Sequence, residues 1–219
     1  MLSQSEENYL KVIFSLQSEK EIKSVSTNDI AQKVQTKASS VTDMLKKLSD
    51  KKLVIYKKYR GVKLTQSGEA FAKKVIRSHR LWECFMVDKL GFAWNEVHET
   101  AEQLEHVKSD ELIDKLDDFL ANPKFDPHGD PIPDKEGNME VKHTLMLSNL
   151  DIGDSGILEG LKNSSDNFLQ YLNNKNLVLG DIIEVKNMES FDNSMLVRTG
   201  NNEFTISHEV AQNLLVKMI

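Results

Sequence analysis

Hydrophobic side chains recur at helical spacing through most of the first 121 residues. Apolar residues three and four positions apart predict amphipathic helices over 6–17, 27–34, 39–51, 70–90, 95–107 and 110–121. Ser26, Asn95 and Ser109 stand at the start of three of these segments, where a side-chain oxygen can accept a hydrogen bond from the first helical turn. The first part of the chain is therefore expected to be mainly helical.

The second and third of these helices are separated by only four residues. In the third helix, Val41, Leu45 and Leu48 repeat on one face, which should pack inward and leave the opposite face exposed. Two strand-like runs, 53–56 and 62–65, follow and flank the polar segment KKYRG, which predicts a β-hairpin. Two helices joined by a short turn and followed by a hairpin indicate a winged helix-turn-helix.

The pattern changes after residue 122. All four prolines lie within 123–133, where they disfavour regular structure and predict a loop or linker. Short strands are expected beyond it at 182–185, 195–198 and 204–206, with one helix at 166–172. The fold class is thus mainly α with small β parts. We expect three domains, at 1–73, 74–142 and 143–219, the last of them a small barrel.

Charge is distributed unevenly along the chain. The net charge is -6, yet residues 1–73 carry 14 basic and 8 acidic residues, whereas the remainder carries 14 and 26. A basic module on an acidic body is typical of a DNA-binding head, and a solvated lysine-rich face is the alternative. The candidate DNA-contacting residues lie on the third helix and the hairpin tip: Ser39, Ser40, Thr42, Asp43, Lys46, Lys57, Lys58 and Arg60.

Cysteine content and apolar runs indicate the compartment. Cys84 is the only cysteine, so no intrachain disulfide can form. The N-terminus lacks the pattern of a signal peptide, and no run approaches the roughly 18 apolar residues of a membrane span. We expect a cytoplasmic protein that does not enter a membrane.

Histidines and glutamates gather in the central helices at helical spacing. The set consists of His79, Glu83, His98, Glu102, Glu105 and His106. On one helix, positions 98, 102, 105 and 106 would occupy an arc of about 100° beside an apolar stripe. Buried imidazoles and carboxylates are costly unless they are paired or bind a metal. The mixture of nitrogen and oxygen ligands favours Mn(II) or Fe(II) over a thiolate-type zinc site, and a solvated polar face is the alternative.

Two other classes of function stay open at this point. One is a winged-helix regulator that senses an organic ligand, and the other is a di-metal carboxylate enzyme. No nucleophile triad, P-loop or dinucleotide motif follows a suitable strand, so we expect a regulator and not an enzyme. Trp82, Phe85, Met86 and Leu90 exceed the needs of a local core and indicate a dimer interface. His128 stands apart and is expected to be structural.

Longer motifs resemble a known family. The segments SHRLWECF, VHETAEQLEHVKSDEL and PHGDPIP resemble the diphtheria-toxin-repressor and manganese-transport-regulator family. SSVTDMLKKL and IYKKYRGVKLT are similar to its manganese branch. LSNLDIGDSGILEGL and LVLGDIIEV resemble the SH3-like, iron-transport-accessory-type domain of longer members. The resemblance covers essentially the whole chain. It implies an N-terminal winged helix-turn-helix, a helical metal-binding and dimerisation domain with a Pro-rich linker, and a C-terminal SH3-like small β-barrel.

The resemblance also implies a function and a ligand set. Family members are cytoplasmic homodimeric repressors that bind a double-stranded DNA operator, with a divalent metal as corepressor and metal-uptake genes as targets. One implied metal site comprises His79, Glu83 and His98. The other comprises Glu102, Glu105 and His106 with a ligand from the first helix at Asn8.

Several positions depart from the family pattern. Asn8 stands where the iron branch has Met and the manganese branch Asp, and Lys11 replaces a Glu of the manganese branch. Glu102 replaces a Cys of the iron branch, and its hard carboxylate favours Mn(II) over softer ions. In longer members the third domain adds ligands to the first site, which makes Asp166 and Asn167 the candidates here. We therefore expect Mn(II), ahead of Fe(II), to lock the DNA-binding heads of a homodimer.

Overall fold

The protein is described by a computed structural model covering residues 2–19, 24–58 and 60–219. Its chain divides into two compact units. Unit 1 contains the residues up to 79 together with 102–115 and 133–138, and unit 2 contains 80–101, 116–132 and 139–219. The division falls inside the long helix α4 (Gln66–Leu90), so the central helices contribute to both units. Tyr59, at the tip of the expected hairpin, lies outside the described residues.

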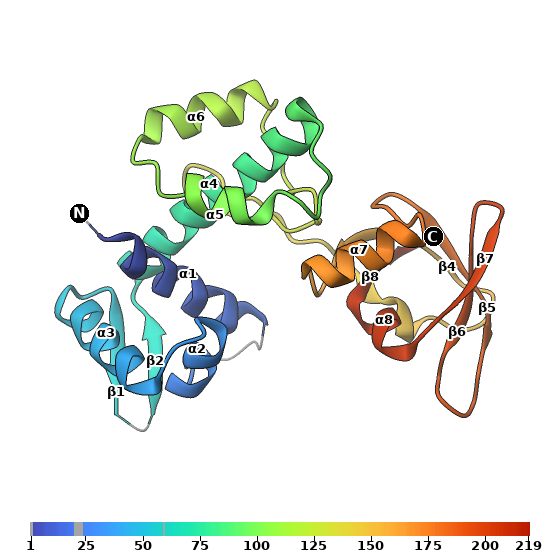
Figure 1. Cartoon of the computed structure of the whole chain (residues 1–219), viewed down its shortest axis with the longest axis horizontal. Helices are drawn as coiled ribbons and strands as arrows, with labels where there is room; N and C mark the ends of the chain where they lie inside the picture. The colour runs from blue at the N-terminus through green and yellow to red at the C-terminus, as the bar shows by residue number, and fades with distance from the viewer. Residues whose placement is uncertain (1, 20–23, 59) are drawn as a thin grey trace. The chain divides into compact units, whose positions relative to one another are not determined.

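The N-terminal part of unit 1 is a winged helix-turn-helix, which confirms the prediction (Figure 1). It consists of α1 (Gln4–Glu19), α2 (Thr27–Lys33), α3 (Ala38–Asp50), β1 (Val54–Lys57) and β2 (Gly61–Leu64). Val41, Leu45 and Leu48 are fully buried, as their spacing requires. Ser26 caps α2 by accepting a hydrogen bond from the backbone N–H of Asp29. The antiparallel hairpin pairs Val54 with Leu64.

The central helices differ from the prediction at one point. The helix α5 (His98–Leu104) is shorter at both ends than the expected 95–107, whereas α6 (Asp110–Phe119) is capped by Ser109 as expected. Asn95 does not cap α5, because two residues separate it from His98, the first residue of the helix. Glu105 and His106 lie in the turn after α5, so they do not continue one helical arc with His98.

The C-terminal domain is built on an antiparallel sheet with strand order β3-β8-β4-β5-β6-β7. Its elements are β3 (Leu145–Met146), η1 (Leu147–Asn149), β4 (Ser155–Leu161), α7 (Asp166–Asn174), β5 (Ile182–Met188), β6 (Met195–Thr199), β7 (Asn202–Ile206), α8 (His208–Asn213) and β8 (Leu214–Met218). Three predicted strands and the helix α7 are confirmed, whereas β3, η1, β4, α8 and β8 were not predicted. A Cβ atom added at Gly156 would meet Val216 Cβ at 2.9 Å, so the close packing of β4 against β8 requires a glycine at this position. Glycine is uncommon in strands, which is why the sequence pattern did not predict β4.

The Pro-rich segment is an ordered loop and not an open linker. Phe125 and Pro131 form an isolated bridge, and Asp126, His128 and Ile132 are buried. The Asp126 carboxylate accepts hydrogen bonds from the backbone N–H groups of His128 and Asp130, both at 2.9 Å. These bonds hold the turn in the absence of helix or sheet. Among the described residues, none of the helices combines the length and the apolar character that a membrane crossing requires.

Candidate metal centres

The first cluster lies in unit 1, where α1 of the winged helix meets the end of α5. Its centre is Glu105, whose side chain has no exposed surface. The Lys11 ammonium group lies 2.8 and 2.7 Å from the two carboxylate oxygens of Glu105 and 2.7 Å from Oε1 of Glu102. One ligand atom each from His79, Glu102 and Glu105 lies within 4.8 Å of the others. Two carboxylates therefore converge on a cation supplied by the chain itself.

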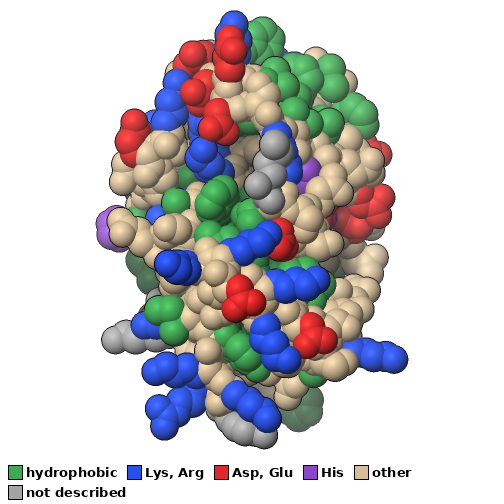
Figure 2. Space-filling view, turned by 90° about the vertical axis from the view of Figure 1, so that its left-hand side faces the viewer, with side chains coloured by type: hydrophobic (Ala, Val, Ile, Leu, Met, Phe, Trp, Pro, Cys, Tyr) green, Lys and Arg blue, Asp and Glu red, His purple; other side chains and the backbone are tan. Residues whose placement is uncertain are grey.

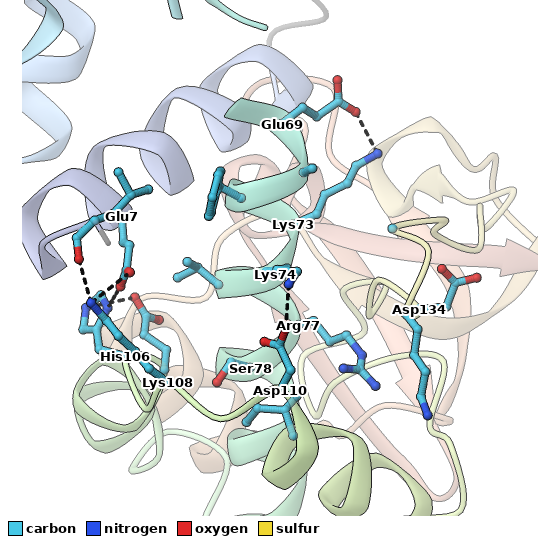
Figure 3. Close-up of a pocket in the computed structure, with 18 of the residues that line it drawn as sticks. Glu7, Glu69, Lys73, Lys74, Arg77, Ser78, His106, Lys108, Asp110 and Asp134 are labelled. Carbon is cyan, nitrogen blue, oxygen red and sulfur yellow. Dashed lines mark hydrogen bonds and ion pairs between the residues drawn. The ribbon is translucent and has the colours of Figure 1, made fainter. Parts of the chain in front are cut away.

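Two histidines of this cluster are oriented by carboxylates. His79 Nδ1 lies 2.6 Å from Oε2 of Glu105, and His106 Nδ1 lies 2.7 Å from Oε2 of Glu7. Figure 3 shows the His106 and Glu7 side chains pointing toward each other. An ionised carboxylate can only accept, so each Nδ1 carries a proton, and in the neutral tautomer with this proton the lone pair is on Nε2. The Nε2 atom of His106 lies 3.7 Å from Oε1 of Glu105. This is the arrangement of a histidine ligand held by a second carboxylate.

Asn8 offers an unpaired acceptor on the helix that carries Lys11. Its Oδ1 atom is buried and has no hydrogen-bond partner among the described residues. A buried acceptor in this state is destabilising unless a donor or a cation completes it. The donor set of Asn8, Glu102, Glu105, His79 and His106 is mainly oxygen with imidazole, and it fits a hard or borderline divalent cation.

The second cluster lies in unit 2 and is centred on Glu83 of α4. One ligand atom each from Glu83, Asp126 and His128 lies within 4.8 Å of the others. His128 Nδ1 is 3.8 Å from Oε2 of Glu83, and His98 Nδ1 is 3.4 Å from Oε1 of Glu83. The Glu83, Asp126 and His128 side chains are almost completely buried, whereas His98 is half exposed. Here two carboxylates converge on imidazoles.

Asp126 reports the charge balance of the second cluster. Burial, followed by the nearby charge of Asp130, raises its pKa to about 6, and Glu83 adds to the rise. Arg80 acts in the opposite direction, because its positive charge favours the carboxylate, and His128 adds to this lowering. Arg80 Nε lies 3.4 Å from Oδ2 of Asp126. The positive charge around Asp126 is thus too small to offset its burial.

The structure brings together three residues that the helical pattern had grouped. One ligand atom each from His79, Glu83 and His98 lies within 4.8 Å of the others, and His79 Nδ1 also contacts Glu105 of the first cluster. Asp166 and Asn167 are exposed at the start of α7 and belong to neither cluster.

Glu7, Asp126 and His128 were missed as site residues. Glu7 is the neighbour of Asn8, and the loop residues show no periodicity that would have marked them. The only signal was their position in the motif DPHGDP, where short-range turns bring side chains together.

The expected DNA-binding surface is exposed on the winged helix. Figure 2 shows Lys and Arg side chains projecting from the lower part of this face of the molecule. The exposed candidates are Ser39, Ser40, Asp43, Lys46, Lys57, Lys58 and Arg60. Thr42 is half-buried and donates its hydroxyl proton to the Ala38 carbonyl at 3.0 Å. Asp43 pairs with Lys46 at 3.2 Å, which balances the one acidic charge of this set.

Apolar side chains are exposed on the central helices of unit 2. Leu90 is 56% exposed and Phe119 is 63% exposed, and Phe119 lies against Phe85 with ring centroids 6.2 Å apart. Met86 differs from the prediction, because it is only 2% exposed and packs in a local core with Val97. The exposed aromatic surface is nevertheless of the kind that a protein partner covers.

Unit 1 also contains an open groove of about 940 Å³ beside the first cluster, lined by α4, the segment after α5 and residues 134–137 (Figure 3). Its charged side chains pair with one another. Lys74 contacts Asp110 at 2.8 Å, and Arg77 contacts Asp114 at 2.9 Å.

Three family descriptions match successive parts of the chain. Residues 1–62 match the iron dependent repressor N-terminal DNA-binding domain, and residues 65–134 match the iron dependent repressor metal binding and dimerisation domain. Residues 145–218 match the FeoA domain.

Individual relatives agree with these matches. An HTH-type transcriptional regulator of Methanocaldococcus jannaschii is 36% identical over 119 residues, which is 54% of this chain and 94% of the relative. The iron-dependent repressor IdeR of Mycobacterium tuberculosis is 35% identical over 127 residues, 58% of this chain and 54% of IdeR. The match thus spans about half the length of that relative.

Solved structures extend the similarity over nearly the whole chain. A manganese-dependent transcriptional repressor in complex with manganese is 31% identical, with a TM-score of 0.88 over 98% of this chain and 100% of that one. The DNA-binding and dimerisation domains account for the basic head and the exposed apolar helices, and both clusters supply ligands suited to a divalent metal. The chain therefore belongs to the iron-dependent repressor family of metal-dependent, DNA-binding transcriptional regulators, and not to a class of enzymes.

Proposed function

We propose that this protein is a cytoplasmic homodimeric repressor of metal-uptake genes whose DNA binding requires Mn(II). The observation that carries the proposal is the first cluster. Its carboxylates from the end of α5 meet Lys11 and the unpaired amide oxygen of Asn8 on α1, which is part of the winged helix. A cation at this point joins the DNA-binding head to the helices that follow it. Such a joint restricts the orientation of the head before DNA is bound.

Each residue has a proposed role. Glu105 and Glu102 would bind the metal through carboxylate oxygens, Asn8 through its amide oxygen, and His79 and His106 through imidazole nitrogens. Bound metal supplies the positive charge that Lys11 supplies in its absence. Glu7 would orient His106 through the 2.7 Å contact with Nδ1.

A second metal site is proposed at Glu83, Asp126 and His128, with His98 as a further ligand. The three buried side chains bring together two carboxylates and an imidazole. Asp126 must be ionised to bind a cation, so this site would release a proton at a pH near or below 6. At acidic pH the second site would therefore bind metal with a lower affinity than the first site.

The donor atoms support the choice of Mn(II) ahead of Fe(II). Carboxylate and amide oxygens are hard ligands that suit Mn(II), and neither cluster contains a thiolate. Glu102 is central to this choice, because a thiolate at the same position would favour softer ions. In the proposed dimer, two α3 helices would enter successive major grooves, about 34 Å apart.

The direct test is a DNA-binding titration. Metal-stripped protein is mixed with a fluorescent duplex selected from random sequences in the presence of Mn(II), and anisotropy is followed as Mn(II), Fe(II) or Zn(II) is added. We expect Mn(II) to act at the lowest concentration and chelation to reverse binding. Equal DNA affinity with and without metal would contradict the proposal.

The DNA-binding surface has its own test. Replacing Lys57 and Lys58 with Ala removes two exposed cations of the wing. DNA binding should weaken on every sequence, and the slope of log affinity against log salt should fall by about 2. Lys115→Ala, at an exposed position of α6, is the matched control. An unchanged slope in the double variant would remove the wing from the DNA interface.

A further inference from the structure

His128 is held from behind by the backbone of Trp94. Its Nε2 atom lies 2.9 Å from the Trp94 carbonyl oxygen, which can only accept a hydrogen bond. The ring proton is therefore on Nε2, and the lone pair of the neutral imidazole is on Nδ1. That atom faces Oε2 of Glu83 at 3.8 Å. The carbonyl thus selects the tautomer that leaves Nδ1 available for a cation.

The Trp94 indole ring also fixes the plane of the imidazole. The two rings are stacked, with centroids 6.1 Å apart and an angle of 18° between their planes. His128 is only 4% exposed, so water competes little for these contacts. The orientation of His128 consequently depends on the position of Trp94.

Trp94 is in turn anchored to the C-terminal domain. Its Nε1–H donates to Oδ1 of Asn173 at 2.6 Å, and Asn173 Nδ2 donates to Oδ1 of Asn95 at 2.9 Å. Asn173 belongs to α7, and the Trp94 side chain packs against the hydrophobic core of the same domain. One amide side chain therefore fastens two consecutive residues of the loop that precedes α5.

We propose that Asn173 is a positioning residue for the second metal site. It holds Trp94, and Trp94 sets the tautomer and the plane of His128. The C-terminal domain thus supports this site through a hydrogen bond and a stacked ring, not by donating a ligand. Asp166 and Asn167, the residues of this domain that the sequence offered as ligands, are exposed, which agrees with a supporting role of the domain. The inference rests on the proposed function only in taking Glu83, Asp126 and His128 as a metal site.

A matched set of variants of the full chain tests the role. Asn173→Leu keeps the approximate size but removes both hydrogen bonds, whereas Asn173→Asp keeps an oxygen that can accept from the indole N–H. Asn174→Asp places the same new charge at the neighbouring exposed position. His128→Gln removes the proposed ligand. Urea unfolding and circular dichroism identify any variant that has lost its fold.

Binding of Mn(II) is measured from the electron paramagnetic resonance signal of the unbound ion. We expect His128→Gln to bind one Mn(II) fewer per chain. Asn173→Leu should weaken that same ion by about 10- to 100-fold, as loss of a hydrogen-bond partner behind a ligand does. Asn173→Asp and Asn174→Asp should stay close to the parent. The more tightly bound ion should be unchanged throughout.

A second readout needs no metal. In metal-free protein, the ¹⁵N resonances of His128 should report the Nε2–H tautomer in the parent and in Asn173→Asp, and a mixture of tautomers in Asn173→Leu. If Asn173→Leu keeps both the parental tautomer and the parental affinity, the positioning role is overturned. If His128→Gln binds as many ions as the parent, the second metal site of the proposed function fails instead, and the tautomer measurement still tests the contact.

Discussion

The two clusters differ in the positive groups that lie beside their buried carboxylates. In the first, Glu102 and Glu105 share the ammonium group of Lys11 at 2.7–2.8 Å. In the second, Glu83 and Asp126 lie close to His128, and Arg80 Nε lies 3.4 Å from Asp126, yet burial raises the pKa of Asp126 to about 6. One cation beside a single oxygen of Asp126 therefore does not offset the burial of that carboxylate, whereas in the first cluster Lys11 contacts three carboxylate oxygens at once.

The largest effect is expected from Glu105→Gln. This carboxylate is fully buried and contacts both Lys11 and His79, so the first cluster loses its centre together with a charge. The tightest Mn(II) site should weaken by about 100-fold or more, as measured by competition with a chelator. Glu99→Gln, an exposed position on α5, is the control. Parental affinity in Glu105→Gln would remove the first cluster from metal binding.

Removal of the internal cation should have the next largest effect. Lys11→Met leaves Glu102 and Glu105 without their shared partner, which should lower the free energy of unfolding of metal-free protein by about 3 kcal/mol. Mn(II) should then bind more tightly, because no ammonium group competes for the same oxygens. Lys11→Arg keeps the charge and serves as the control. Urea unfolding with and without Mn(II) measures both effects. Equal stability of Lys11→Met and the parent would mean that Lys11 does not neutralise this cluster.

The second cluster is tested by Asp126→Asn and by pH. The pKa of Asp126 is about 6 in the folded protein and near 3.8 when exposed, so ionisation favours the unfolded chain. The penalty is complete above pH 6 and disappears below about pH 4. Metal-free Asp126→Asn should therefore be more stable than the parent by about 2 kcal/mol at pH 7, with no difference near pH 4. Parallel stability curves from pH 4 to pH 7 would contradict this account.

A smaller effect is expected from Glu102→Cys. Glu102 is partly exposed, with 38% of its side chain accessible, so the cluster should tolerate a smaller thiol without loss of fold. Mn(II)-driven DNA binding should weaken about tenfold, and the response to Zn(II) or Co(II) should improve, because a thiolate is the softer ligand. An identical Mn(II) midpoint in the variant and the parent would show that Glu102 is not a ligand.

The sequence predicted the elements whose buried face repeats at a regular spacing. The burial of Val41, Leu45 and Leu48 followed from their spacing, and the caps at Ser26 and Ser109 followed from local chemistry. By contrast, β4 was hidden because tight packing against β8 requires glycine, a residue that strand propensities disfavour.

The candidate site residues likewise fall into those that follow a helical spacing and those that do not. Glutamate and histidine at helical spacing were recognised, but the early end of α5 moved Glu105 and His106 off its arc and separated them from His98. Asp126 and His128 meet Glu83 through a turn held by side-chain to backbone hydrogen bonds, and no periodic pattern encodes such a contact. The match of charges across 91 residues, from Lys11 to Glu102, is likewise a property of the fold and not of any local segment.

The ammonium group of Lys11 gives metal loading the character of ion exchange. Glu102 and Glu105 would exchange the ammonium group of Lys11 for a divalent ion, so the charge inside the pocket would rise by one unit and not by two. A cation would be present at the two carboxylates both with and without metal. Glu102 and Glu105 would therefore not face each other without a positive charge between them, which would cause repulsion. The rate of metal loading should then depend on how fast the Lys11 side chain moves away from the two carboxylates. The speed of the response would be a property of Lys11 as well as of the metal concentration.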